Sequence, residues 1–391
     1  MLNIKKLTLI SFLMYYFTGS LTVTTGNIID SISKYFNVSI SNMSFHFSFL
    51  SLGILIAMIV NNYIRKIIII KNQIIFSFYL IIISIIILII NNHNINIFSF
   101  CVFLFGFVGG ISLSIGTFLI TNIYDNKKRS FFMLITDSFF SIAGIIFPFI
   151  ISFFVVKKIN FIWIYSIISF IYLIIFYLTL ITNFNEFNKL NKKKNKKKKR
   201  FKIENILLFL SSLFYISAQC MFVSWIPIYI KKYINNINYF YENKTISIFW
   251  FFYMLGMWFF SYISKKFDIQ KILIFLTFIS SILVFIFLQC KNINLLNFII
   301  SLIGFFSSSI YTIIITLSSM QTKKPYTKFI NLTLIFGTTG SFITLNISYF
   351  LLSSNNTFIV LCISNILYFI VFIINIILLF FTKHNKFNNY K

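Results

Sequence analysis

The sequence predicts an all-α membrane protein of twelve transmembrane helices in two six-helix, pseudo-symmetric halves. Three observations support this prediction: an extreme apolar composition, twelve apolar runs of spanning length, and short motifs that recur at a constant offset. Of the 391 residues, 59% are hydrophobic and only 10% are charged. A soluble domain is closer to about 45–50% apolar and about 25% charged. Lipid is therefore the solvent for most of this chain.

Twelve runs are long enough to cross the hydrocarbon core, which takes about 20 mostly apolar residues. The first follows Lys5 and Lys6 as in a signal peptide, but it is too long for one and no small-residue cleavage site follows. The third is almost pure isoleucine and would suit a buried strand, yet an open strand cannot satisfy its backbone in lipid. The expected spans are 7–29, 46–63, 70–90, 98–122, 131–155, 161–182, 205–230, 246–263, 271–289, 295–319, 329–352 and 357–381.

The basic residues test this topology. Twelve spans place both termini and every loop that follows an even-numbered span on one side of the membrane. That side carries 27 of the 34 Lys and Arg residues, and the other side carries 7. Without the ten basic residues of the central 189–202 run, the ratio is still 17 to 7. Because loops rich in Lys and Arg stay in the cytoplasm, both termini are expected there.

The central basic run is expected to be a linker. It separates an N-terminal half, residues 1–182, from a C-terminal half, residues 205–391, and the linker itself covers 183–204. The run has no apolar face, so a solvated cytoplasmic segment that attracts anionic lipid headgroups is expected. No aromatic residues interleave with its charges in a nucleic-acid-binding pattern, so no nucleic-acid partner is expected.

Several short motifs recur between the halves. "KYFN" at 34–37 and "KYIN" at 232–235 are 198 residues apart, as are "GFVGG" from Gly106 and "GFFSS" from Gly304. Gly53 and Gly256 pair at an offset of 203. The basic pair Arg65–Lys66 and the segment "KKFD" at 265–268 occupy equivalent loops. The near-constant offset predicts a parallel repeat of six helices.

This arrangement, with a basic cytoplasmic loop after the second helix of each half, resembles the major facilitator superfamily. Within it, "SIGTFLITNIYDNKKRSFFMLITDSFFSIAGIIFP" (114–148), "SFHFSFLSLGIL" (44–55) and "GFFSSSIYTIIITLSSMQTK" (304–323) resemble the TsgA family of bacterial inner-membrane proteins. The resemblance covers essentially the whole chain. It implies a multi-pass inner-membrane protein classed with transporters, in a branch near the fucose:proton symporters.

The resemblance also shows where this chain departs from that branch. The symporters carry acidic residues in the first and fourth spans, where this chain offers Thr, Gly and Asn and then Ser114, Ile115 and Gly116. Asp137 falls about where the branch has a neutral Asn in the fifth span. If coupling to protons exists, the expectation is that Asp137 carries it.

Asp137 is the most informative residue, because the chain has only seven acidic side chains. It lies eight residues beyond Arg129, or about 12 Å along a helix, near the midplane of a core about 30 Å thick. Its helical face is small and polar (Ser130, Leu134, Asp137, Ser141, Gly144, Pro148 and Ser152), and the opposite face is bulky (Phe132, Ile135, Phe139, Ile142, Ile146, Phe149 and Phe153). Asp137 is therefore either a structural carboxylate capped by hydroxyl groups or a protonatable, solute-binding group in a cavity.

Other candidates extend this hypothesis into the rest of the bundle. The expected solute or proton pathway consists of Asp137, Thr22, Asn27, Ser141, Gln219 and Tyr311. Threonines at helical spacing, and single Gln or Tyr residues in a span, also serve simply to tie helices together. Charged residues in or beside the cytoplasmic loops are candidates for gating contacts: Arg65, Lys66, Asp125, Arg129, Lys266 and Asp268.

These observations predict a secondary active transporter of a small solute. The alternative is a non-transporting sensor or accessory protein on a transporter scaffold, which a fully packed interior would indicate. An enzyme is not expected, because no nucleophile elbow, paired carboxylates or metal-ligand spacing occurs. The four cysteines show no paired spacing, so no disulfide, metal or cofactor is expected. The expected partners are membrane lipid, an unknown solute and protons, and the expected state is a monomer.

Overall fold

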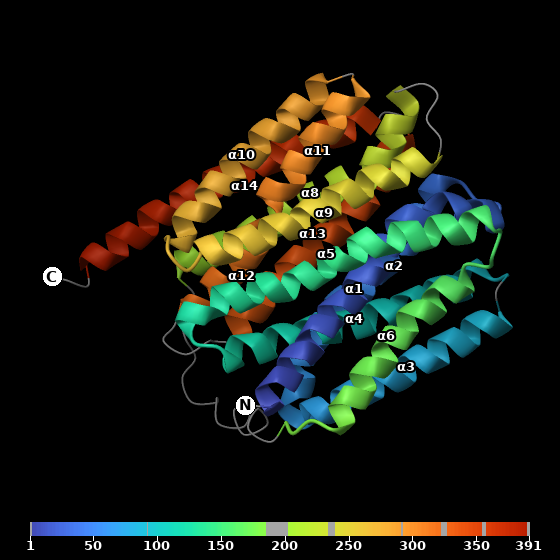
Figure 1. Cartoon of the computed structure of the whole chain (residues 1–391), viewed down its shortest axis with the longest axis horizontal. Helices are drawn as coiled ribbons and strands as arrows, with labels where there is room; N and C mark the ends of the chain where they lie inside the picture. Colours follow the sequence, from blue (N-terminus) through green and yellow to red (C-terminus); the bar gives the residue numbers. More distant parts are fainter. Residues whose placement is uncertain are drawn as a thin grey trace.

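The computed structural model of the chain describes residues 2–91, 93–184, 202–233, 239–290, 292–321, 327–353 and 357–388. Within these ranges every regular element is a helix (Figure 1). The helices are α1 (Leu2–Tyr35), α2 (Ile40–Ile67), α3 (Ile70–Ile90), α4 (Ile95–Ile123), α5 (Asn126–Val156), α6 (Ile162–Leu180), α8 (Ile203–Tyr233), α9 (Tyr239–Ile263), α10 (Ile269–Gln289), α11 (Ile293–Ser307), α12 (Ile310–Met320), α13 (Thr327–Ser353) and α14 (Thr357–Asn388).

The helices agree with the twelve predicted spans. Among the described residues, eleven helical segments are long and apolar enough to cross a membrane, with α11 and α12 together forming one of them. Helix α13 occupies the remaining predicted span, 329–352. The isoleucine run is helix α3, which buries one face and exposes Phe76, Tyr79 and Ile83 on another. Such an exposed apolar face is expected of a helix that faces lipid.

The two halves lie side by side. In Figure 1, α3 and α6 form the lower edge of the bundle and α10 lies along the upper edge. Between the halves, α5 packs against α9 and α2 packs against α13. These two pairs are related by the predicted repeat, since α5 corresponds to α13 and α2 to α9. Any space enclosed at the centre of the bundle is therefore bounded by both halves.

The recurring glycines mark the same helix crossing in each half. In the N-terminal half, a side chain added at Gly106 would collide with the backbone of Leu50, so α2 and α4 cross in direct backbone contact. In the C-terminal half, a side chain added at Gly304 would meet the backbone of Phe249, where α9 and α11 cross. Helix association in lipid depends on such close packing of small residues. The sequence repeat therefore corresponds to a repeated structural contact.

The tenth span differs from its predicted continuous helix. Helix α11 ends at Ser307 and α12 begins at Ile310, with three consecutive buried serines at the junction. Serine side chains compete with helical hydrogen bonds, and Ser308 Oγ donates to the carbonyl of Phe305 at 2.8 Å. The carbonyl of Ser307 accepts a hydrogen bond from Tyr215 Oη of α8 at 2.6 Å. The neighbouring helix therefore satisfies a backbone group at the interruption.

The ends of the chain lie at the same end of the bundle. Helix α1 begins, and α14 ends, toward the left of Figure 1. Most of the expected linker, residues 185–201, lies outside the described residues. The domain boundaries at 182 and 205 and the solvated state of the linker stay predictions.

Replacing Gly106 with Ala should lower the free energy of unfolding by about 1–3 kcal/mol, because the new methyl group overpacks the crossing of α2 and α4. Thermal unfolding of the purified protein in detergent measures this. The matched control is Gly26→Ala, because a side chain at Gly26 meets no atom within 4 Å. Equal or higher melting of Gly106→Ala than of the unmodified protein would contradict the tight crossing.

Candidate functional site

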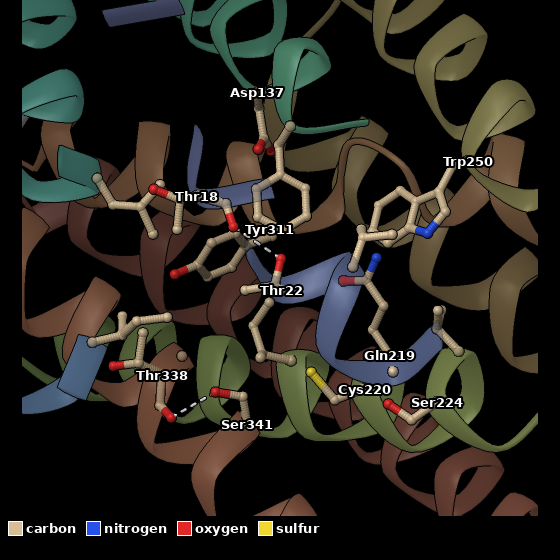
Figure 2. Close-up of a pocket in the computed structure, with 18 of the residues that line it drawn as sticks. Thr18, Thr22, Asp137, Gln219, Cys220, Ser224, Trp250, Tyr311, Thr338 and Ser341 are labelled. Atoms are coloured by element: carbon tan, nitrogen blue, oxygen red, sulfur yellow. Dashed lines mark hydrogen bonds between the residues drawn. The ribbon is translucent and has the colours of Figure 1, made fainter. Parts of the chain in front are cut away.

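A cavity of about 200 Å³ lies between the two halves (Figure 2). Helices α1, α2, α4 and α5 of the N-terminal half and α8, α9, α12 and α13 of the C-terminal half contribute to its wall. The lining residues are Tyr15, Thr18, Thr22, Val23, Gly26, Asn27, Ile54, Leu113, Asp137, Phe140, Ile216, Gln219, Cys220, Val223, Ser224, Ile246, Trp250, Tyr253, Tyr311, Leu334, Gly337, Thr338 and Ser341. The wall is predominantly apolar and aromatic, and its one ionisable acid is an aspartate.

Asp137 projects from α5 into this cavity. Figure 2 shows it across the cavity from Gln219 and Cys220 of α8. Its neighbours on the small, polar face of α5, Leu134 and Ser141, are completely buried, whereas Asp137 is only partly buried. On the opposite face, Ile146, Phe149 and Phe153 are 40%, 47% and 56% exposed. An exposed apolar surface of this kind suits contact with lipid. The small, polar face of α5 thus turns toward the interior of the bundle, and Asp137 lies where this face meets the cavity.

A hydrogen bond joins Asp137 to the other half of the protein. Thr312 Oγ1 of α12 donates to the Oδ2 of Asp137. Thr312 lies immediately after the interruption between α11 and α12. No described cationic group forms an ion pair with Asp137. The carboxylate therefore has a hydroxyl partner from the C-terminal half and no charge partner in the cavity.

Three tyrosines line the same cavity as Asp137: Tyr15 of α1, Tyr253 of α9 and Tyr311 of α12. The hydroxyl group of Tyr15 lies 2.7 Å from Thr117 Oγ1. The Tyr311 ring packs against Gly337, where an added side chain would lie 2.7 Å from the tyrosine hydroxyl. Asp137 therefore faces an aromatic surface built from both halves.

Trp250 closes the wall next to α5. Its ring fills the space that a side chain at Gly144 would need, and its centroid is 5.2 Å from that of Tyr253. The indole Nε1–H is buried and has no hydrogen-bond partner. Gly144 thus brings α5 and α9 together around the tryptophan ring.

Five of the six expected pathway residues meet in this cavity: Thr22, Asn27, Asp137, Gln219 and Tyr311. The sixth, Ser141, is not part of the lining, and its Oγ lies 3.8 Å from the sulfur of Met257 in α9. Small polar residues on one helical face serve close packing as well as cavities, which is why the pattern alone did not separate Ser141 from Asp137. A role of any of these residues in binding stays a prediction.

The cavity and contact residues that the sequence interpretation did not select include Tyr15, Trp250, Tyr253 and Thr312. Tyr15 was accessible to reasoning, since it extends the face of Thr18 and Thr22 by one more helical step. Trp250 and Tyr253 follow the same three-residue spacing on α9. Thr312 had no comparable signal, because its direction depends on the interruption of the tenth span.

The expected gating residues lie near one end of the bundle. Arg65 is 7% exposed, and its guanidinium lies 5.1 Å from the ring centroid of Phe118. Arg129 is 3% exposed, and its backbone N–H donates to the carbonyl of Asp125 at 2.8 Å, which begins α5. Asp268 accepts from the backbone N–H of Gln270 at 2.9 Å and thereby caps α10. The side chain of Asp268 thus caps a helix, whereas Asp125, the N-cap residue of α5, makes no side-chain capping hydrogen bond.

The two lysines of the C-terminal loop differ in their contacts. Lys266, the predicted gating residue, is exposed, and the side chain of Lys66 lies outside the described residues. Lys265, which the sequence interpretation did not select, places its Nζ 3.7 Å from the ring centroid of Phe131 on α5. This cation–π contact links the halves at the same end as Arg65 and Arg129.

The cavity lies away from the first turns of α1 and α5. On α1 its lining runs from Tyr15 to Asn27, and on α5 it begins at Asp137. In the described ranges, His, Cys, Asp and Glu side chains form no group of three that could hold a metal ion. Among the described lining residues, Gly26 is exposed and faces open space.

Comparison with known proteins agrees with this architecture. The sequence profile of the Major Facilitator Superfamily matches residues 7–343. A protein named TsgA homolog from Buchnera aphidicola subsp. Acyrthosiphon pisum (strain 5A) is 45% identical over 388 residues, covering 99% of this chain and 100% of that protein. A TsgA homolog from Yersinia pseudotuberculosis (serotype O:1b) is 39% identical over 386 residues, covering 98% of each.

Solved structures share the fold at low sequence identity. The crystal structure of FucP, a Major Facilitator Superfamily transporter, in the outward conformation has a TM-score of 0.69 at 16% identity, covering 94% of this chain and 98% of FucP. The proton:xylose symporter XylE has a TM-score of 0.77 at 12% identity, covering 95% of this chain and 94% of XylE. The protein is thus a multi-pass membrane protein, and it belongs to the TsgA family of the major facilitator superfamily.

Proposed function

We propose that this protein is a secondary active transporter that moves a small solute across a bacterial inner membrane by alternating access, coupled to protons through Asp137. One observation carries the proposal: a cavity between the halves contains one acidic side chain, on α5, which is hydrogen-bonded to α12 of the other half. A sensor on the same scaffold would be expected to have a packed interior. The cavity therefore favours transport.

The position of Asp137 gives coupling a physical basis. A charged aspartate near the centre of the bilayer costs about 2.5–3.5 kcal/mol on insertion scales. Asp137 has no cationic partner among its described contacts. Uptake of a proton, or binding of a positively charged group of the solute, removes this free-energy cost. Because Thr312 comes from the other half, movement of one half against the other changes the carboxylate's environment. The protonation of Asp137 and the rocking of the halves are thereby linked.

The basic residues favour an orientation for this cycle. The end that holds Arg65, Arg129 and Lys265 carries the Lys- and Arg-rich loops, which favours a cytoplasmic position with both termini on that side. The open end near Gly26 then faces outward. In this proposal the structure represents an outward-facing state, with the contacts between the halves closed on the cytoplasmic side.

The names of the structural neighbours are compatible with proton coupling. FucP is described as a fucose:proton symporter and XylE as a proton:xylose symporter. Neither identity is high enough to carry a solute over to this chain. The proposal for Asp137 rests on its own placement in the cavity.

Asp137→Asn should abolish proton movement driven by solute, because the amide keeps the shape of the side chain but cannot exchange a proton. The measurement uses proteoliposomes loaded with a pH-sensitive dye and any solute that drives proton uptake or release by the unmodified protein. The matched control is Asp30→Asn, which neutralises a carboxylate paired with Lys34 at 2.7 Å outside the cavity. Coupled proton movement that persists in Asp137→Asn would rule out this role.

Cys220 provides a native reporter of the open end, because it lines the cavity. In a background with Cys290 and Cys362 changed to Ser, a small membrane-impermeant thiosulfonate should modify Cys220 from the outer face. Cys101 is completely buried and should stay unmodified. Mass spectrometry of spheroplast membranes distinguishes the two sites. Failure to modify Cys220 from the outside, with modification from the inside, would reverse the proposed orientation of the cavity.

Lys265→Gln should raise modification of Cys220 from the cytoplasmic face about two- to fivefold. The variant loses a cation–π contact between the halves, worth about 0.5–1 kcal/mol at an exposed site, and so increases the population open to the cytoplasm. Rates in inverted vesicles provide the measurement. Lys266→Gln is the control, since both lysines are exposed but the described cation–π contact with Phe131 belongs to Lys265. An equal increase in both variants would mean that bulk charge, and not the contact, is responsible.

A further inference from the structure

We propose that the solute is a small organic monocation, such as a protonated amine or a quaternary ammonium ion, bound between the Asp137 carboxylate and the aromatic wall of the cavity. This inference rests on the proposed transport function and specifies its substrate class. It departs from a sugar, the solute class that the names of the structural neighbours would suggest.

The charge of the cavity is the first argument. Among the described residues, its lining contains Asp137 and no Lys, Arg or His. Asp137 has a hydroxyl partner, Thr312, and no described ion pair. An anionic solute would meet uncompensated repulsion there, whereas a cation would supply the missing counter-charge. Charge-assisted hydrogen bonds of this kind are stronger than neutral ones.

The aromatic residues are the second argument. The cavity that contains Asp137 is also lined by Tyr15, Tyr253, Tyr311, Trp250 and Phe140. Aromatic rings attract organic cations through their quadrupoles, most strongly in sites shielded from water. A carboxylate together with several rings therefore offers a cation two favourable interactions at once.

The hydroxyl groups of the cavity argue against a polyol. Four of its five Ser and Thr side chains already donate to backbone carbonyls: Thr18 to Met14 at 3.0 Å, Thr22 to Gly19 at 3.1 Å, Thr338 to Leu334 at 3.1 Å and Ser341 to Thr338 at 2.9 Å. A sugar has many hydroxyl groups that need partners when buried. The Ser and Thr side chains of the cavity therefore offer few unused donors to provide them.

The volume of the cavity narrows the class further. At about 200 Å³ it lies below the range of about 300–1,000 Å³ typical of sites for drug-sized ligands. The solute is thus expected to be a compact cation.

The test compares cations with neutral molecules of the same shape. The full-length protein is titrated by calorimetry with choline and 3,3-dimethylbutan-1-ol, and with benzylammonium and benzyl alcohol. Each cation should bind at least about tenfold more tightly than its neutral counterpart. Asp137→Asn should reduce this preference to about twofold or less, whereas Asp30→Asn should leave it unchanged.

Three results would overturn the inference: equal binding of the neutral molecules, a cation preference that survives in Asp137→Asn, or cation binding weaker than about 1 mM. The outcomes also separate this inference from the proposed function. A protein that couples protons to a neutral solute but rejects the cations remains a transporter of another substrate class. A protein that binds the cations through Asp137 without moving protons keeps the substrate class and loses proton coupling.

Discussion

The absence of water in the hydrocarbon core is the constraint on which this structure depends. Each backbone N–H and C=O group there needs a partner from the protein. The described spans meet this requirement by helix formation, and the exceptions have specific partners. At the interruption of the tenth span, Tyr215 donates to the carbonyl of Ser307. At the buried carboxylate, Thr312 donates to Asp137. Both exceptions lie in the middle of the bundle, where the protein itself provides the polar groups.

Duplication explains the scaffold but not the chemistry of the cavity. The crossing of α2 with α4 repeats in that of α9 with α11, through glycines at corresponding positions of the two halves. The equivalent of Asp137 in the second half is Thr333, which donates to Ser318 Oγ at 2.8 Å and does not line the cavity. The repeated positions hold the helices together, and the positions where the halves differ give the cavity its charge and its rings.

Much of the fold could be predicted because lipid imposes simple rules on composition and length. The inward placement of Asp137 followed from the small residues around it, and the repeat followed from Gly106 and Gly304. Prediction of the site from sequence was limited where one residue type serves both to pack helices together and to line a cavity. Ser141 packs against Met257 although it shares a face with Asp137. The Thr312 contact depends on the interruption of a helix, and the spacing of apolar residues does not predict how that interruption turns the side chain. Lys265 differs from Lys266 in the direction of its side chain, which brings Lys265 to a ring.

The glycines carry a further implication about how this sequence can change. Only 12 of the 391 residues are glycine, in a chain dominated by residues that A+T-rich codons encode. At nine of the twelve, an added methyl group would come within 3.0 Å of a neighbouring atom. On the lipid-facing surfaces, one bulky apolar residue can replace another at little cost, so codon bias can act freely there. The glycines are therefore the positions at which this bundle tolerates substitution least. They limit how far the amino-acid composition of the chain can change.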